Sequence, residues 1–91
     1  MKNNKKTLLL NIVIVNWNTG IYLKKCIESI LKFEKRDDIL ITIVDNNSSD
    51  NSLKITNYSD ERIRIIKLKK NYGFAKACNI GANNIKSKYE N

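Results

Sequence analysis

The sequence predicts an α/β fold, in which a parallel sheet carries helices on both faces in a three-layer α/β/α arrangement. Three short apolar segments, at residues 8–15, 39–44 and 63–68, have the length of buried strands. They alternate with segments in which apolar residues recur every three or four positions, which is helical spacing. Strands that alternate with helices favour right-handed crossovers, and such crossovers make neighbouring strands parallel.

The first strand and helix are the clearest elements. Residues 8–15 (LLLNIVIV) form a nearly continuous apolar run, as expected for a strand covered on both faces. Asn18, Thr19 and Gly20 then form a turn that offers a helix cap. The helix that follows is predicted to bury the face that carries Leu23, Cys26, Ile27, Ile30 and Leu31.

The second and third units repeat this order. Residues 39–44 form a second buried strand, and the polar segment 45–52 is rich in turn-forming residues. A short helix is expected at about residues 50–58, although its apolar pattern is weak. The third strand, 63–68, alternates partly and therefore belongs nearer an edge. The last helix has an apolar face with several small residues, which allow a close approach to the sheet: Phe74, Ala77, Cys78, Gly81, Ala82 and Ile85.

The composition narrows the chemistry. The chain has 91 residues, so it is one small domain or a piece of a larger one. It contains no histidine, which excludes Ser-His-Asp and Cys-His catalysis and most zinc sites. Cys26 and Cys78 fit no metal-ligand spacing, and both fall on predicted apolar helix faces. We interpret them as small buried side chains in a reducing compartment.

The charge and the apolar first strand bear on partners and location. Lysine and arginine total 17 against 9 acidic residues, a net charge of +8. The lysines are scattered and form no basic helix, so no nucleic acid is expected as a partner. The alternative is a non-catalytic basic module that binds nucleic acid or an anionic surface, with an affinity that falls steeply with salt.

Residues 8–15 are too short to span a bilayer, and the small residues of a signal-peptide cleavage site do not follow them. This favours a cytoplasmic chain. A basic surface also attracts acidic lipid headgroups, so peripheral association with the inner face of the membrane stays open.

Polar loops follow all three predicted strands. They are residues 16–18, 45–47 and 71–73. Ligands of parallel sheets bind at the carboxyl ends of the strands, so the three loops together predict a binding site. Residues 71–73 also precede a helix N-terminus, where backbone N–H groups favour anions.

Several residues of these loops allow a structural and a functional interpretation. Trp17 either caps the core or stacks on a flat base. Asp45 either hydrogen-bonds within its own turn or accepts from an N–H or hydroxyl group of a nucleoside. Asp50 fits a cap of the next helix, so we expect Asp45 to serve the ligand and Asp50 the stability of the fold. The Gly-rich dinucleotide fingerprint and the phosphate-loop lysine motif are both absent, which excludes an ordinary nicotinamide-binding domain and a P-loop enzyme.

Four segments resemble the start of family 2 glycosyltransferases, most closely the branch often described as rhamnosyltransferase-like. They are IVIVNWN, CIESIL, ITIVDNNSSDNS and KKNYGFAKACNIGA. In that family, segments of the form VIVNYN, VDNxSxD and NxGFAxAxNxG follow one another in this order. The resemblance covers about residues 11–89, and it is specific for the superfamily but not for the donor or acceptor sugar.

The resemblance implies a sugar-nucleotide-binding half-domain of the GT-A type, which is Rossmann-like. Val15 and Trp17 would line the nucleobase pocket, and Asp45 and Asn46 would contact the base and ribose. Three further residues would shape the loop and helix near the diphosphate and sugar: Asn71, Gly73 and Asn79. Many relatives carry a second acid at the position of Asn46, so the choice between uridine and thymidine stays open.

The resemblance also implies which parts of the family domain this chain lacks. The metal-binding DxD motif follows the next strand in the family, the catalytic base lies in the acceptor half, and this sequence contains neither. A divalent metal, Mg²⁺ or Mn²⁺, is therefore expected for the full family domain. We interpret residues 1–10 as a basic tail with the start of the first strand, and residues 11–91 as the N-terminal part of the domain.

The function implied by the resemblance is transfer of a sugar from a UDP- or dTDP-linked donor to an acceptor glycan, in cell-surface polysaccharide synthesis. This chain is expected to supply the nucleotide-binding part, as a fragment of the family domain, and to transfer no sugar on its own.

Overall fold

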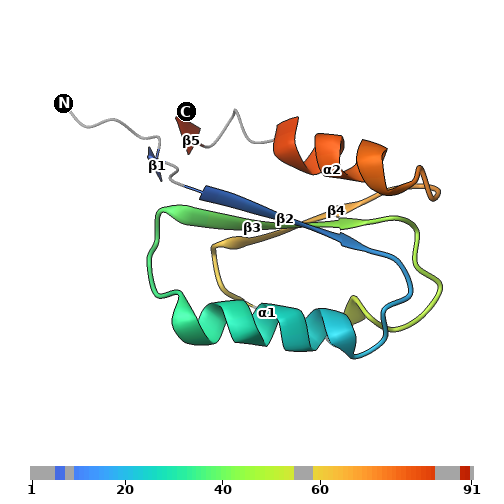
Figure 1. The fold of residues 1–91 in the computed structure, drawn as a ribbon, viewed down its shortest axis with the longest axis horizontal. Coiled ribbons are helices and arrows are strands. Elements are labelled where there is room, and N and C mark those ends of the chain that lie inside the picture. The colour runs from blue at the N-terminus through green and yellow to red at the C-terminus, as the bar shows by residue number, and fades with distance from the viewer. Residues whose placement is uncertain (1–5, 8–9, 55–58, 84–88, 91) are drawn as a thin grey trace.

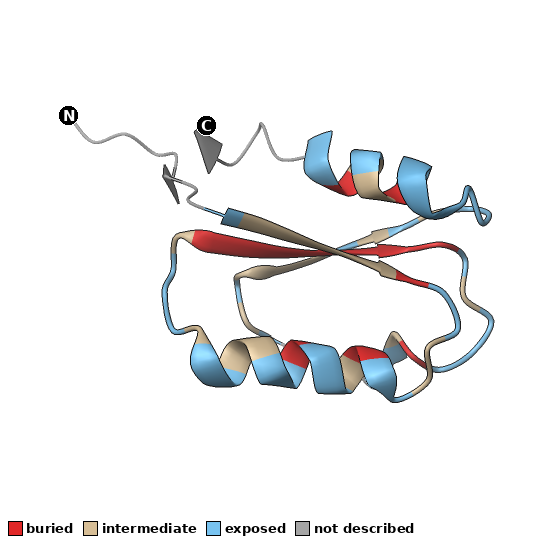
Figure 2. Cartoon of the chain, viewed as in Figure 1, coloured by how far each residue is buried: buried red, intermediate tan, exposed pale blue. Residues whose placement is uncertain are grey.

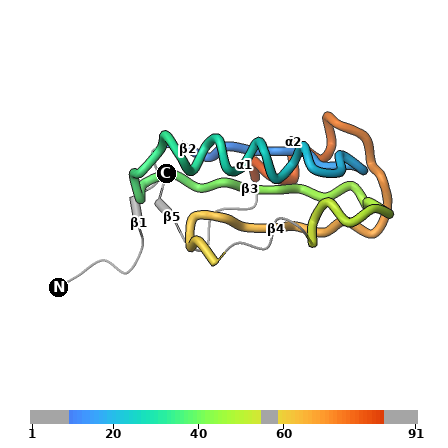
Figure 3. Tube along the Cα trace, turned by 90° about the horizontal axis from the view of Figure 1, so that it is seen from below, coloured from blue at the N-terminus to red at the C-terminus, as the bar shows by residue number. Residues whose placement is uncertain are grey.

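The computed structural model describes residues 6–7, 10–54, 59–83 and 89–90, and it has the predicted α/β architecture. Its elements in chain order are β1 (Lys6–Thr7), β2 (Leu10–Asn16), α1 (Tyr22–Phe33), β3 (Ile39–Asp45), β4 (Ile63–Lys67), α2 (Phe74–Asn83) and β5 (Tyr89–Glu90). Strands β2, β3 and β4 lie side by side in that order and are parallel (Figure 3). Helices α1 and α2 cover opposite faces of this sheet (Figure 1). A second parallel sheet pairs β1 with β5.

The predicted strands agree with the structure to within two residues at each end, as far as the chain is described. β4 is an edge strand of its sheet and is only partly buried, which confirms the prediction made from its alternation. The helix expected at residues 50–58 is described only to Lys54, where a 3₁₀ turn begins. The rest of that predicted helix lies outside the described residues.

The core between the sheet and α1 consists of isoleucine and leucine side chains. Strand alternation turns one set of isoleucines toward α1: Ile12, Ile14, Ile39, Ile41, Ile43 and Ile63. They pack against Leu23 and Ile27, which are buried in α1. The central strand β3 is buried along its whole length, because strands flank it and helices cover it (Figure 2).

The predicted burial of Cys26 is wrong, because this thiol is exposed. The buried stripe of α1 runs through Leu23 and Ile27, with Ile30 and Leu31 partly buried beside it. Cys26 lies at the flank of this stripe, where the sheet no longer covers the helix.

The contact between the sheet and α2 is close, and a glycine makes it possible. A Cβ atom at Gly81 would lie 2.6 Å from Cγ1 of Val13 and 2.8 Å from Cγ2 of Val44. Beside this contact, the Asn11 amide donates to the Gly81 carbonyl at 3.2 Å. The predicted close approach of this helix is therefore confirmed.

Two residues predicted on the buried face of α2 are exposed instead. Ala77 and Gly81 are buried, whereas Ala82 is exposed and Phe74 is 72% exposed. The narrow gap between helix and sheet admits small side chains and excludes a phenyl ring, so Phe74 turns outward. Ile85, predicted on the same face, lies outside the described residues.

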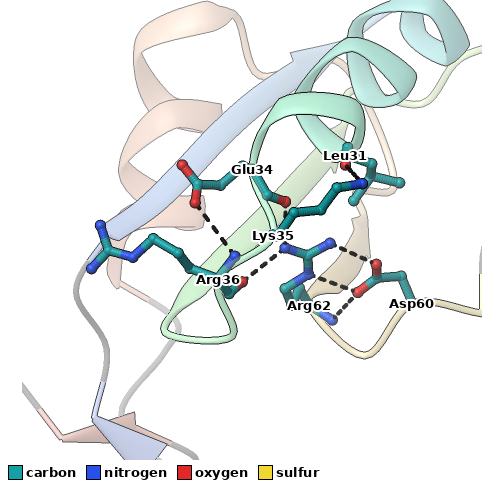
Figure 4. Close-up of polar contacts among 6 residues, drawn as sticks. All are labelled: Leu31, Glu34, Lys35, Arg36, Asp60 and Arg62. Atoms are coloured by element: carbon teal, nitrogen blue, oxygen red, sulfur yellow. Dashed lines mark hydrogen bonds and ion pairs between the residues drawn. The ribbon is translucent and has the colours of Figure 1, made fainter.

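An arginine joins the chain segments at the amino ends of β3 and β4, opposite the edge of the predicted site (Figure 4). Arg62 Nη1 donates to the backbone carbonyls of Glu34 and Arg36, each at 2.8 Å. The same guanidinium forms an ion pair with Asp60, with Nη2 and Oδ2 2.9 Å apart. The hydrogen bonds from Arg62 hold the pKa of the Asp60 carboxyl below its usual value.

Candidate functional site

The first two polar loops continue the backbone ladder of the sheet beyond the strand ends. The Asn46 N–H donates to the Asn16 carbonyl, and the Leu68 N–H donates to the Asp45 carbonyl, each at 2.9 Å. The loops that follow β2, β3 and β4 therefore start side by side at the carboxyl edge of the sheet.

Asn16, the last residue of β2, is the centre of a buried hydrogen-bond network on the α1 side of this edge. Its Nδ2 donates to Asp45 Oδ1 at 2.8 Å and to Ser52 Oγ at 2.9 Å, and lies 3.2 Å from Ser48 Oγ. Thr19 Oγ1 donates to Asn16 Oδ1. Asn16 is not among the site residues predicted from the sequence. The signal that could have found it is an amide on the core-facing side of an apolar strand, where a polar group needs buried partners.

Asp45 is buried and accepts three hydrogen bonds from the loops. Oδ1 accepts from Asn16 Nδ2 at 2.8 Å and from Ser48 Oγ at 2.6 Å, and Oδ2 accepts from the Ser48 N–H at 3.0 Å. The structural interpretation of Asp45 as a residue that hydrogen-bonds within its own turn is therefore confirmed, and these buried contacts lead us to expect that Asp45 also contributes to stability. A carboxylate has about four acceptor positions, so these three hydrogen bonds from described residues leave one position, on Oδ2, unfilled.

Asn18 and Asp50 join the same loops nearer the surface. Asn18 has a left-handed φ of +51°, and its Oδ1 accepts from the backbone N–H of Ser49 at 2.7 Å. Asp50 Oδ1 accepts from the Ser52 N–H at 3.1 Å, as expected of a helix cap, and Oδ2 accepts from the Gly20 N–H at 2.8 Å. The hydrogen bond from the Ser52 hydroxyl is the main cause that lowers the pKa of Asp50.

Asn46 holds the third loop on the α2 side of the edge. Its buried amide donates from Nδ2 to the Gly73 carbonyl at 3.2 Å and accepts at Oδ1 from the Tyr72 N–H at 3.1 Å. Gly73 has a φ of +88°, which favours glycine, and its N–H donates to Asn71 Oδ1 at 2.8 Å. The Asn46 side chain therefore positions residues 71–73 through their backbone.

The structure divides the predicted site residues between the two faces of the sheet. The Asp45 carboxylate lies on the α1 side with Asn16, whereas Val15 comes two residues after the α2-facing Val13 and therefore faces α2 as well. Trp17 is 53% exposed, which excludes the interpretation that it caps the core. Three further predicted residues are also exposed: Asn71, Gly73 and Asn79. Of the predicted site residues, Asp45 lines a cavity formed by described residues.

A cavity of about 300 Å³ opens beside Asp45. Its described lining consists of Asp45, Asn47, Ser48, Asp50, Leu53, Lys54, Lys67 and Leu68. A second cavity, of about 340 Å³, shares Leu53, Lys54 and Lys67 with the first and adds Ile65. Because they share these residues, the two cavities adjoin each other, between the segment that follows β3 and the surface of β4. Neither lysine is among the site residues predicted from the sequence, because no motif marks them.

The described carboxylates do not fit a divalent metal. Within the described part of the chain, no three His, Cys, Asp or Glu side chains lie close enough together to hold one. Mg²⁺ requires near-octahedral oxygen coordination, while the oxygens of Asp45 and Asp50 already accept hydrogen bonds from the loops. Among the described helices, none combines the length and the apolar character needed to cross a membrane.

Comparison with known proteins identifies the family. Residues 11–89 match the family described as Glycosyl transferase family 2. Glycosyltransferase GlyG of Streptococcus pneumoniae serotype 4 is 37% identical over 84 residues, which cover 89% of this chain and 28% of that protein. A teichoic acid poly(glycerol phosphate) polymerase of Staphylococcus epidermidis is 33% identical over 84 residues, which cover 88% of this chain and 12% of that protein. The chain thus spans less than a third of the length of either relative.

Proposed function

We propose that this chain, which belongs to glycosyl transferase family 2, binds the nucleotide part of a UDP- or dTDP-linked sugar at the carboxyl edge of its sheet. The observation that carries the proposal is the Asp45 carboxylate, which borders a cavity of about 300 Å³ and keeps one acceptor position. A pyrimidine N–H or a ribose hydroxyl can donate to that position. The volume is at the lower end of the range for small-ligand sites, which suits a nucleoside.

In this proposal the nucleotide lies across the edge, from the α1 side toward the start of α2. The base lies at Asp45, and the side chains of Val15 and the exposed Trp17 border the route toward α2. The diphosphate and sugar extend toward three residues: Asn71, Gly73 and Asn79. In support, the first N–H groups of a helix favour anionic groups, and α2 begins directly after Gly73.

For the complete proteins of this family we propose sugar transfer with inversion at the anomeric carbon. An acidic residue removes the proton of an acceptor hydroxyl, the hydroxyl oxygen attacks that carbon, and the nucleoside diphosphate leaves. A divalent metal, when bound, neutralises the charge on the departing diphosphate. The described residues of this chain do not fit the metal, so its own contribution is to bind and orient the nucleotide.

We also propose a role in the synthesis of a cell-surface polymer. One relative is named a teichoic acid polymerase, and the motif NxGFAxAxNxG resembles the rhamnosyltransferase-like branch. The acceptor is then a glycan or a glycan-like polymer. The net charge of +8 supports a cytoplasmic position at the inner face of the membrane, where acidic lipids attract basic surfaces.

The fluorescence of Trp17, the one tryptophan in the sequence, tests the proposal directly. Trp17 is 53% exposed and borders the proposed route of the nucleotide, so a nucleotide that binds along this route will quench its emission. We expect saturable quenching by UDP or dTDP, with an affinity that depends on the base. Binding that is the same for all nucleotides and falls steeply with salt would instead identify a basic surface that tracks phosphates.

A further inference from the structure

The side of α1 that faces away from the sheet is exposed and carries aromatic and basic residues (Figure 2). Leu23 and Ile27 lie on the side that packs against the sheet. With 3.6 residues per turn, six exposed residues of the other side fall within about a third of the helix circumference. These six residues, which we call the outer face of α1, are Tyr22, Lys25, Cys26, Ser29, Lys32 and Phe33.

Two aromatic rings lie at the two ends of this outer face. Tyr22 is 73% exposed and Phe33 is 78% exposed, and about 16 Å of helix axis separates the two residues. Lys32 extends beside the second ring, with its Nζ 5.3 Å from the centroid of the Phe33 ring. Aromatic rings beside lysines are typical of helices that lie on a membrane, because the rings enter the interface while the ammonium groups stay at the headgroups.

The charge of the outer face is positive. It contains Lys25 and Lys32, whereas Glu28, the one acidic residue of α1, lies outside it. In the part of the chain that the structure describes, neither lysine takes part in an ion pair. Both ammonium groups can therefore contact acidic lipid headgroups, which attract basic residues close to a membrane surface.

The same composition argues against a second copy of this chain as the occupant. Two antiparallel copies of α1, packed through their outer faces, would bring Lys25 of one copy near Lys32 of the other, where like charges repel. The small side chains of Cys26 and Ser29 separate the two rings, so the face has no continuous apolar seam for another helix. A bilayer needs no such seam, because each ring enters the interface by itself.

A surface that contacts the outer face of α1 leaves the proposed nucleotide site open. α1 lies along one face of the sheet, whereas the loops after β2, β3 and β4 start at the carboxyl edge (Figure 1). A bilayer parallel to the axis of α1 therefore does not cover this edge, and a soluble nucleotide sugar can still reach it.

We propose that the outer face of α1 binds the anionic surface of a lipid bilayer. Tyr22 and Phe33 enter the headgroup region, and Lys25 and Lys32 contact the acidic headgroups. The inference rests on the proposed position at the inner face of the membrane, and it is independent of how the nucleotide is bound. It assigns that position to one side of one helix and orients the sheet parallel to the bilayer.

Co-sedimentation of the 91-residue chain with lipid vesicles tests this assignment. The vesicles consist of phosphatidylcholine alone, or of phosphatidylcholine mixed with an equal amount of phosphatidylglycerol. The variants are Phe33→Ser and Lys32→Ala, and α2 offers matched controls. Phe74 is 72% exposed, and Lys76 has its Nζ 4.5 Å from the centroid of the Tyr72 ring, so Phe74→Ser and Lys76→Ala remove the same groups from the other helix.

We expect the parent to sediment with the mixed vesicles and not with the neutral ones. Lys32→Ala should weaken binding to the mixed vesicles roughly fivefold, because one lysine near the surface contributes about that factor. Phe33→Ser should weaken it as well, because its ring no longer leaves water on binding. Phe74→Ser and Lys76→Ala should bind the mixed vesicles as tightly as the parent does.

The outcomes separate the inference from the proposed function. If the α2 controls weaken binding as much as the α1 variants do, or if the α1 variants bind like the parent, the inference is wrong. If the parent does not sediment with the mixed vesicles, the proposed membrane position is wrong too. A parent dimer that Phe33→Ser converts to a monomer, seen by sedimentation velocity, would show that a second copy occupies this face instead. Quenching of Trp17 by UDP, which Phe33→Ser should leave unchanged, tests nucleotide binding separately in each case.

Discussion

Replacing Gly81 with alanine adds one methyl group at the contact between α2 and the sheet. The new Cβ would lie 2.6 Å from Cγ1 of Val13 and 2.8 Å from Cγ2 of Val44, both shorter than real carbon contacts. Rotating Val13 alone does not remove the clash, because Cγ2 of Val44 also lies 2.8 Å from the same point. The helix must therefore move away from the sheet, which also lengthens the 3.2 Å hydrogen bond from Asn11 to the Gly81 carbonyl.

The expected size follows from two opposing terms. Overpacking a well-packed core costs about 1–3 kcal/mol. Alanine is favoured over glycine within a helix by about 1 kcal/mol. We therefore expect Gly81→Ala to lower the free energy of unfolding by up to about 2 kcal/mol. Each kcal/mol lowers the melting temperature of a domain of this size by about 4–8 °C.

Thermal and urea melts of three variants measure these terms separately. Ala82→Gly, at an exposed position of the same helix, measures the helix-propensity term without the clash. Val13→Ala removes the closest methyl group, so Gly81→Ala should be less destabilising in that background than in the parent. If Gly81→Ala stabilises the chain by the amount that Ala82→Gly destabilises it, the close-packing argument is wrong.

Three further predictions concern the polar groups. Asp45→Ala should weaken the binding of UDP or dTDP, measured by calorimetric titration. It should also lower the free energy of unfolding by about 1–3 kcal/mol, because buried donors lose their acceptor. Weaker binding with an unchanged melting temperature would show that the contacts of Asp45 with the loops contribute nothing to stability. Asn46→Ala should leave the 71–73 backbone without its buried partner, so hydrogen exchange at the Tyr72 amide should accelerate, while slow exchange would contradict this role. Asp50 and Asp60 have a pKa lowered from the usual 3.8, so their stabilisation is present above that value and is lost as the pH falls through their folded pKa. Acid melts of Asp60→Asn should show a smaller loss of stability below about pH 4 than the parent, and equal slopes would refute the assignment.

The sequence predicts the three core strands and the two longer helices of this fold because the spacing of their apolar residues is clear. The run at residues 39–44 has no polar interruption except Thr42, and the structure buries the corresponding strand between two others. Burial of individual helix residues is harder to predict, as Cys26 and Phe74 show. Helical spacing defines an apolar face, whereas the width of sheet beneath it decides which residues of that face are covered.

The candidate site is predictable only as an edge. The alternation of strands and helices along the chain places three polar loops at one edge of the sheet. The hydrogen-bond partners within these loops depend on the loop conformation, which the spacing of apolar residues does not predict. The sequence leaves Asp45 open as a turn residue or a ligand contact, and it gives no sign that Asn16 is the donor that orients the carboxylate. Lys54 and Lys67 belong to no motif, and only the register of β4 against β3 brings Lys67 beside Asp45.

The groups that would meet the base are held by the fold before any ligand arrives. Asn16 and Ser48 orient the Asp45 carboxylate, so binding the base need not order this acceptor, and preorganisation of this kind raises affinity. The same contacts tie binding to stability, because a variant that weakens the network lowers both. A nucleotide that binds only the folded chain raises its melting temperature according to its own affinity. The ligand-induced shift, measured in each variant at the same nucleotide concentration, therefore separates a lost ligand contact from a weakened fold, which the absolute melting temperature alone does not.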